Sequence, residues 1–142
     1  MKTCLPDVNF WLALTFERHA HHVPATRWIA TASSPTCIFC RATQQGFLRL
    51  ATNPRVFGDE TLTMADAWRA YDQLFDDPRT AYADEPEDIE RVWCSFTQGR
   101  VFSPKVWSDA YLAAFALACD FELVTFDRGL AQYKDLRCTV LT

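Results

Sequence analysis

Short apolar segments of strand length alternate along this chain with longer segments of helical periodicity. The strand-like segments lie at residues 2–6, 36–40, 80–83, 121–126 and 138–141. The helix-like segments between them lie at residues 10–16, 22–32, 41–52, 63–75, 86–96 and 105–119. Strands joined through helices run parallel, with right-handed crossovers and helices on both faces. The sequence therefore predicts an α/β fold, a three-layer α/β/α sandwich around a central parallel sheet of four to five strands.

The length and composition favour one folded unit. With 142 residues, the chain has the size of a single domain, which we expect to span 1–142. A hydrophobic fraction of 49% and an aromatic fraction of 14% exclude a disordered chain. The net charge of −4 excludes a protein that coats nucleic acid through a strongly basic surface. An acidic protein can still act on nucleic acid when metal ions neutralise its site, or bind a basic protein partner.

The N-terminal apolar run does not have the form of a secretion signal. Pro6, Asp7 and Asn9 interrupt it, and Glu17 ends it. No run approaches the roughly 18 to 20 apolar residues of a membrane-spanning helix. We therefore expect a soluble, cytoplasmic protein with no membrane partner.

Cysteine and histidine do not form a convincing metal motif. Cys37 and Cys40 are spaced as CxxC, but no second CxxC or histidine pair completes the four ligands of a zinc site. His19, His21 and His22 lie at a loop-to-helix junction, where a solvated face is the simpler interpretation.

Three aspartates lie at the ends of apolar elements. Asp7 and Asp127 follow predicted strands, and Asp109 begins the most apolar helix. Ligands of parallel sheets bind at the carboxyl ends of the strands, near the point where the strand order reverses. Each aspartate alone would also fit a helix cap or a first-turn acid. Together they predict one acidic pocket suited to Mg²⁺ or Mn²⁺.

Four segments then carry a family resemblance. LPDVNFWLAL, TQQGFLRLATNPRVFG, SDAYLAAFA and LVTFDRG occur in this order, and together they resemble the PIN-domain ribonucleases of the VapC toxin type. The resemblance implies a PIN-like α/β/α sandwich and an acidic site with one or two Mg²⁺ or Mn²⁺ ions. It also implies RNA as substrate, a cognate antitoxin as protein partner, and a toxin homodimer.

The resemblance also assigns roles to individual residues. Asp7, Asp109 and Asp127 match the metal-binding, catalytic aspartates, while Asn9 and Thr125 match polar positions beside the site. Asn9 would also fit a helix N-cap, and Thr125 an ordinary strand residue. The implied reaction is an in-line attack on the RNA phosphorus by a metal-activated water.

One position departs from the family pattern. The family has a glutamate where this chain has Gln44, which keeps a ligand oxygen but loses the charge. Gln44 would serve as a neutral or water-mediated ligand, with Asp84 and Glu85 as acids able to compensate. The alternative is a catalytically impaired PIN module that binds RNA or a protein partner without cutting.

Four arginines are candidates for contacts with the RNA backbone, since phosphate contacts position a nucleic-acid substrate. They are Arg41, Arg49, Arg55 and Arg128. Response-regulator receivers and haloacid-dehalogenase-type phosphatases also use aspartates at strand ends. The receiver pattern matches only Asp7, and the phosphatase DxD is replaced by Asp7-Val8-Asn9, so both classes are disfavoured.

Overall fold

The computed structural model describes residues 2–31 and 36–142. Within them, one sheet of five parallel strands has the order β3-β2-β1-β4-β5. The strands are β1 (Thr3–Pro6), β2 (Thr36–Phe39), β3 (Thr80–Tyr82), β4 (Glu122–Thr125) and β5 (Cys138–Val140). The α-helices are α1 (Val8–Thr15), α2 (His22–Thr31), α3 (Arg41–Ala51), α4 (Pro54–Phe57), α5 (Met64–Leu74), α6 (Ile89–Thr97) and α7 (Val106–Cys119). Two short 3₁₀ helices are η1 (Gly58–Glu60) and η2 (Arg128–Gln132).

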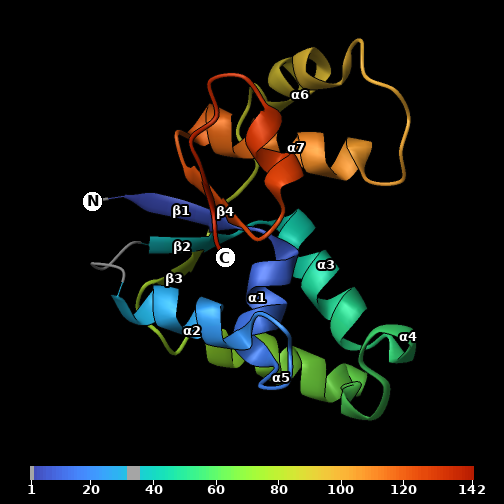
Figure 1. Cartoon of the computed structure of the whole chain (residues 1–142). Coiled ribbons are helices and arrows are strands. Elements are labelled where there is room, and N and C mark those ends of the chain that lie inside the picture. Colours follow the sequence, from blue (N-terminus) through green and yellow to red (C-terminus); the bar gives the residue numbers. More distant parts are fainter. Residues whose placement is uncertain (1, 32–35) are drawn as a thin grey trace.

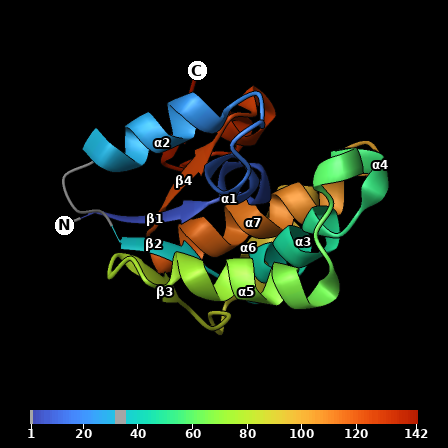
Figure 2. The same ribbon diagram turned by 90° about the horizontal axis from the view of Figure 1, so that it is seen from below.

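The helices form two layers on opposite faces of the sheet. Figure 1 shows α6 and α7 above the strands, and α1, α2, α3 and α5 below them. In Figure 2, seen from below, β1 and β2 are visible between α2 and α5. The predicted three-layer α/β/α sandwich is confirmed, with a parallel sheet at the upper end of the expected size.

Alternate strand residues build the two halves of the core, because successive side chains of a strand point to opposite faces. Cys4, Phe39 and Val124 pack into the cluster that includes the buried residues of α1, α3 and α5. Their neighbours Leu5 and Ile38 instead pack with α6 and α7. These strands are buried on both faces, which explains why their sequences are continuously apolar.

Aromatic packing fixes α1 against the sheet. The Trp11 ring stacks on the Phe39 ring of β2 with centroids 4.0 Å apart, and Phe10 meets Trp28 edge-on at 5.4 Å. Phe10 and Trp11 are almost fully buried. Because α1 begins directly after β1, this packing also fixes the direction in which the chain leaves the sheet at Asp7.

The predicted elements all occur, with ends that differ by at most three residues. The helix expected at 86–96 begins at Ile89, and the last residue of the helix expected at 22–32 lies outside the described residues. Residues 53–62, expected to be a loop, contain α4 and η1. The Asn-Pro signal begins a helix here because Asn53 accepts a hydrogen bond from the Arg55 N–H and Pro54 occupies the first helical position. Within residues 2–31 and 36–142, every helix is too short or too polar to cross a membrane.

Gly46 allows α3 to cross α1 closely. A Cβ at this position would lie 2.6 Å from Cγ2 of Val8. We expect Gly46→Ala to lower the free energy of unfolding by about 1–2 kcal/mol through overpacking, although alanine favours a helix. In a Val8→Ala background the added methyl has room, so the same change should be neutral or stabilising. Urea unfolding of the four proteins measures this coupling, and equal effects of Gly46→Ala in both backgrounds would contradict it.

Candidate active site

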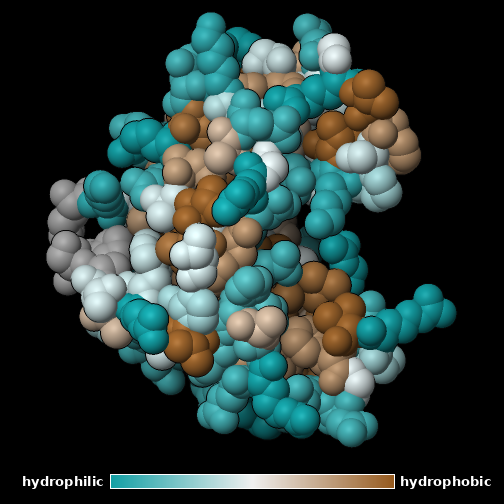
Figure 3. Space-filling view, in the orientation of Figure 1, coloured by the Kyte–Doolittle hydropathy of each residue, from teal (hydrophilic) through white to brown (hydrophobic). Residues whose placement is uncertain are grey.

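A cavity of about 430 Å³ opens at the point where the strand order reverses. From β1 the chain crosses to β2, whereas from β4 it crosses to β5 on the other side, so the carboxyl ends of β1 and β4 flank a crevice. Figure 3 shows the surface indented between the part that carries α7 and the part that carries α3 and α4. The cavity is lined by Asp7, Val8, Asn9, Ala42, Thr43, Gly46, Arg49, Leu50, Pro104, Lys105, Ser108, Asp109, Leu112, Asp127 and Leu130.

Three different elements bring the predicted aspartates into this cavity. Asp7 directly follows β1, Asp127 follows β4 and caps η2, and Asp109 lies in the first turn of α7. Asn9, from the first turn of α1, is exposed at the same cavity. Here Asp7 is the N-cap of α1, so Asn9 is not its cap. The structure thus groups residues that are more than 100 positions apart in sequence.

Asp7 is held rigidly. Its side chain is only 7% exposed. Oδ1 accepts a hydrogen bond from the Phe10 N–H at 2.9 Å, and Oδ2 accepts one from the Thr125 hydroxyl at 2.6 Å. The residue therefore caps a helix and faces the cavity at once, so the capping and site interpretations of the sequence both apply to it.

Thr125 connects two of the aspartates. Its fully buried hydroxyl donates to Asp7 and accepts a hydrogen bond from the Asp127 N–H at 2.9 Å. The Asp127 carboxylate accepts in turn from the Gly129 N–H at 2.8 Å. Thr125 therefore lies beneath the cavity as a support for the acids rather than in its lining.

The acids influence one another electrostatically. Burial raises the pKa of Asp7, the hydrogen bonds from Thr125 and Phe10 oppose this shift, and the charges of Asp109 and Asp127 add to it. Burial also raises the pKa of Asp109, followed by repulsion from Asp127, while Lys105 lowers it. Desolvated, mutually repelling carboxylates are stabilised by a cation placed between them.

The sequence did not predict two exposed polar residues of the cavity. Lys105 and Ser108 precede Asp109, and the Asp109 N–H donates to the Lys105 carbonyl at 2.9 Å. Their position within one helical turn of a candidate ligand was a usable signal. A cation and a hydroxyl beside an acidic centre suit a phosphate-bearing substrate.

Gln44 is not among the residues that line the cavity. Ala42, Gly46 and Arg49 of α3 face it, whereas the Gln44 side chain is buried and accepts a hydrogen bond from Arg41. It also lies against the Tyr71 side chain of α5. The structure does not bring Gln44 together with the three aspartates.

Of the four candidate arginines, the structure brings one to the cavity. Arg49 lines it, whereas Arg41 lies over the Tyr82 ring at 5.2 Å. Arg55 is exposed on α4, and Arg128 is exposed in η2 without lining the cavity. Arg41, Arg55 and Arg128 therefore do not line the cavity at which we expected them to contact the RNA backbone.

Asp84 and Glu85 belong to a different cavity. With Arg41, Tyr82 and Tyr111 they line a space of about 500 Å³, and the Tyr111 hydroxyl donates to Glu85 at 2.6 Å. They are therefore not placed to replace a missing acid among the three aspartates.

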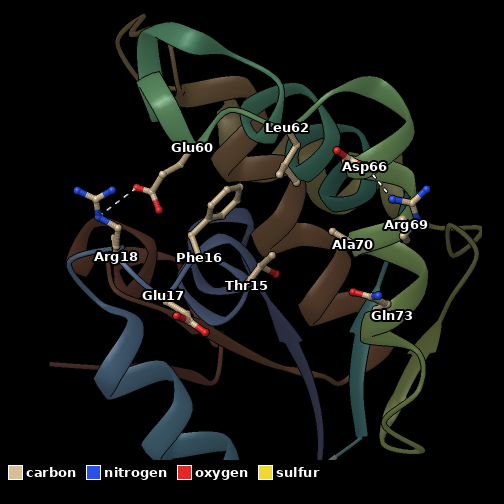
Figure 4. Close-up of a pocket in the computed structure, with 10 residues that line it drawn as sticks. All are labelled: Thr15, Phe16, Glu17, Arg18, Glu60, Leu62, Asp66, Arg69, Ala70 and Gln73. Atoms are coloured by element: carbon tan, nitrogen blue, oxygen red, sulfur yellow. Dashed lines mark hydrogen bonds and ion pairs between the residues drawn. The ribbon is translucent and has the colours of Figure 1, made fainter.

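A further cavity of about 490 Å³ lies at the end of α1 (Figure 4). Its carboxylates are largely paired: Glu60 with Arg18 at 4.0 Å, and Asp66 with Arg69 at 2.6 Å. Phe16 and Leu62 supply an apolar wall. Acids neutralised by arginine have no need of a metal ion, so the acidic cavity at the strand ends is the better candidate for chemistry.

The donor set of the acidic cavity fits a hard divalent cation, since three carboxylates and the Asn9 amide offer only oxygen ligands of the preferred kind. Among the described residues, however, no three His, Cys, Asp or Glu side chains are already arranged to hold a metal ion. Asp7 is fixed by its two hydrogen bonds. A cation would therefore have to draw Asp109 and Asp127 inward or be completed by water.

Comparison with known proteins identifies the family. The PIN domain description matches residues 4–136. The chain is 46% identical to the protein named Ribonuclease VapC41 of Mycobacterium tuberculosis, over 96% of this chain and 97% of that one. This chain belongs to the PIN-domain family, and its resemblance to the VapC type is confirmed.

Solved structures of VapC proteins share the PIN fold of this chain. Mycobacterium tuberculosis VapC20, described as a toxin that cleaves the Sarcin-Ricin loop, aligns with a TM-score of 0.66 at 20% identity, over 95% of this chain and 99% of that one. VapBC-1 from nontypeable Haemophilus influenzae aligns with a TM-score of 0.69 at 19% identity, covering 97% of each chain. The similarity extends over almost the whole PIN-domain chain.

The raised pKa of Asp109 gives a testable pH dependence. The folded protein holds this proton more tightly than the unfolded chain, so ionisation above the ordinary pKa of 3.8 favours unfolding. We expect metal-free Asp109→Asn to gain stability over the wild type as the pH rises from about 3 to about 7. Chemical unfolding across this range measures the difference. Asp76→Asn, at an exposed aspartate outside the cavity, is the control, and an Asp109→Asn effect that does not change with pH would contradict the assignment.

Proposed function

We propose that this protein is a Mg²⁺- or Mn²⁺-dependent endoribonuclease that acts as the toxin of a toxin–antitoxin pair. One observation carries the proposal: Asp7, Asp109 and Asp127 face a single cavity at the switch point of the sheet, beside Lys105 and Arg49. An acidic centre with flanking cations suits cleavage of a phosphodiester backbone.

The relatives support RNA as the substrate class. VapC41, at 46% identity, is named a ribonuclease, and VapC20 is described as a toxin that cleaves the Sarcin-Ricin loop. Because the first of these relatives aligns over nearly its full length, the same reaction class is the simplest proposal for this chain.

In this proposal each residue of the cavity has a distinct task. Asp7, fixed by Thr125 and the Phe10 N–H, provides a carboxylate of constant orientation. Asp109 and Asp127 would complete the ligand set around the cation. When bound, the divalent ion supplies charge stabilisation at the phosphate and lowers the pKa of a coordinated water.

The remaining groups act on the substrate. Lys105 and Arg49 would contact non-bridging phosphate oxygens and hold the backbone across the cavity, where they also offset the acidic charge. The Ser108 hydroxyl and the Asn9 amide are exposed there and can hydrogen-bond to the substrate or to water. Orientation of the scissile phosphate by fixed groups is a large part of catalysis in such sites.

The alternative of a catalytically impaired PIN module depended on Gln44. That side chain is occupied by Arg41 and Tyr71, outside the acidic cavity. A neutral residue there removes no carboxylate from the cavity, so Gln44 does not support the impaired module.

A protein antitoxin is the proposed partner. Solved structures with the same fold include VapBC-1 of Haemophilus influenzae and VapBC2 of Rickettsia felis, the latter bound to a promoter DNA fragment. Exposed apolar side chains, among them Met64, Trp68, Phe102 and Trp107, offer surfaces for protein contacts. Apolar groups gather on both sides of the surface indentation in Figure 3. The homodimer remains a prediction.

The proposed activity is tested by incubating purified protein with total RNA in Mg²⁺, Mn²⁺ or EDTA. We expect discrete fragments that require metal and a loss of at least about 10²-fold in rate for Asp7→Asn, because the amide removes a charged ligand, while its oxygen can still accept the hydrogen bond from the Phe10 N–H.

Gln44→Glu is the matched comparison. Because Gln44 lies outside the cavity, we expect its change to glutamate to alter the rate by less than about threefold, or 0.6 kcal/mol in activation free energy. Cleavage by Gln44→Glu alone would establish the impaired module instead, and metal-independent cleavage that survives Asp7→Asn would overturn the proposed mechanism.

A further inference from the structure

A second, smaller cavity adjoins the acidic one and shares Asp109 as part of its wall. Its volume is about 260 Å³, and Arg100, Ser103, Gln132 and Tyr133 line it together with Val101 and Val106. These residues come from the connection between α6 and α7, from the start of α7, and from the end of η2 and the residue after it. Asp109 lines both cavities, so a ligand that extends beyond the acidic centre on this side would enter the second cavity.

Arg100 is the basic residue of this cavity, and its side chain is pre-oriented. Its guanidinium carbon lies 4.2 Å from the centroid of the Tyr133 ring, and its Nε donates to the Phe96 carbonyl at 2.7 Å. The Tyr133 ring is itself buried against Phe96, with ring centroids 5.1 Å apart. These contacts engage Nε and one face of the guanidinium, and they leave its terminal nitrogens as donors for a ligand.

The other polar groups of the cavity also suit a nucleotide. The Gln132 amide nitrogen donates to the Gly129 carbonyl at 2.7 Å, which leaves the amide oxygen as an acceptor. The Ser103 side chain lines the same cavity. The set combines a stacked arginine fork with a hydroxyl and an amide oxygen, which matches a phosphate and its attached sugar.

We infer that this second cavity binds an RNA phosphate next to the scissile one, with Arg100 as the positioning residue. The inference rests on the proposed ribonuclease function and extends it. Lys105 and Arg49 line the acidic cavity, and Arg100 lines the second cavity, which shares Asp109 with the first. The RNA backbone would thereby contact cations in both cavities, which offsets the repulsion between phosphates and carboxylates.

The test measures binding of a labelled single-stranded RNA of about 12 nucleotides over a series of salt concentrations. An Asp7→Asn background prevents cleavage during the measurement. We expect Arg100→Ala to weaken binding about tenfold, because it removes a charged hydrogen-bond donor. It should also reduce the slope of log affinity against log salt by about 0.7, the value for one lost phosphate contact on a single strand.

Arg100→Lys and Arg91→Ala are the comparison variants. Lysine keeps the charge without the planar fork, so the salt slope should stay near the parent value while the affinity falls less than with alanine. Arg91 lies on α6 with a largely exposed side chain paired to Asp88, and its removal should leave both quantities unchanged. A DNA strand of the same sequence should show the same loss with Arg100→Ala, because the contact is to phosphate.

The outcomes separate this inference from the proposed function. An unchanged salt slope and affinity in Arg100→Ala, while the wild type cuts RNA, would overturn the phosphate site and leave the ribonuclease intact. Failure of the parent to bind RNA, with no cleavage by the wild type, would overturn both. A purely structural role for Arg100 at the end of α6 would lower the melting temperature without changing the salt slope.

Discussion

The hydrogen bond from the Thr125 hydroxyl to Asp7 joins the ends of the two central strands, and the acidic cavity depends on it. β1 and β4 are neighbours in the sheet, and the chain leaves their carboxyl ends toward opposite sides. Thr125 links the two ends by donating to Asp7 and accepting from the Asp127 N–H. The Asp7 carboxylate and the Asp127 backbone therefore keep fixed positions although the chain between them passes through most of the fold.

The same geometry buries negative charges that destabilise the metal-free folded protein. Burial and mutual repulsion raise the pKa of Asp7 and Asp109, so ionising them works against folding. Packing in the surrounding core offsets this unfavourable contribution to the free energy of folding. Trp11 stacked on Phe39 and Phe10 packed against Trp28 hold α1 in place, and the Asp7 carboxylate stays at the start of that helix. A cation in the cavity would reduce the repulsion, so metal binding would stabilise the folded protein.

The fold and the acidic triad could be predicted from the sequence because both follow local rules. Apolar runs such as FELVTF define strands, and parallel sheets present their strand ends at one edge, so Asp7 and Asp127 were expected to meet. Asp109 was predicted from its position at the start of an apolar helix. The function of the chain was suggested by four separated segments taken together, which the relationship to PIN domains explains.

The positions that the sequence did not predict depend on helix rotation and on tertiary contacts. Gln44 and Gly46 are two residues apart in α3 and point to different sides, and only the packing against Val8 and Tyr71 decides which side faces the cavity. The arginines show the same limit. Arg49 is at the cavity, whereas Arg41 contacts Gln44 and Tyr82. The sequence alone does not indicate which of the two arginines faces the cavity. Lys105 and Arg100 reach the two cavities from the connection that precedes α7. Tertiary packing sets the path of this connection.

The central claim is that Asp7, Asp109 and Asp127 form one cation site, and titration of the metal-free protein with Mn²⁺ tests it most directly. Calorimetry of the wild type beside each single Asp→Asn variant gives the affinity without any need for RNA or activity. The account predicts saturable binding by the wild type and a loss of at least about tenfold in affinity in all three variants, since each removes a charged oxygen ligand. Binding that is absent from the wild type, or that persists unchanged in any of the three, would contradict it.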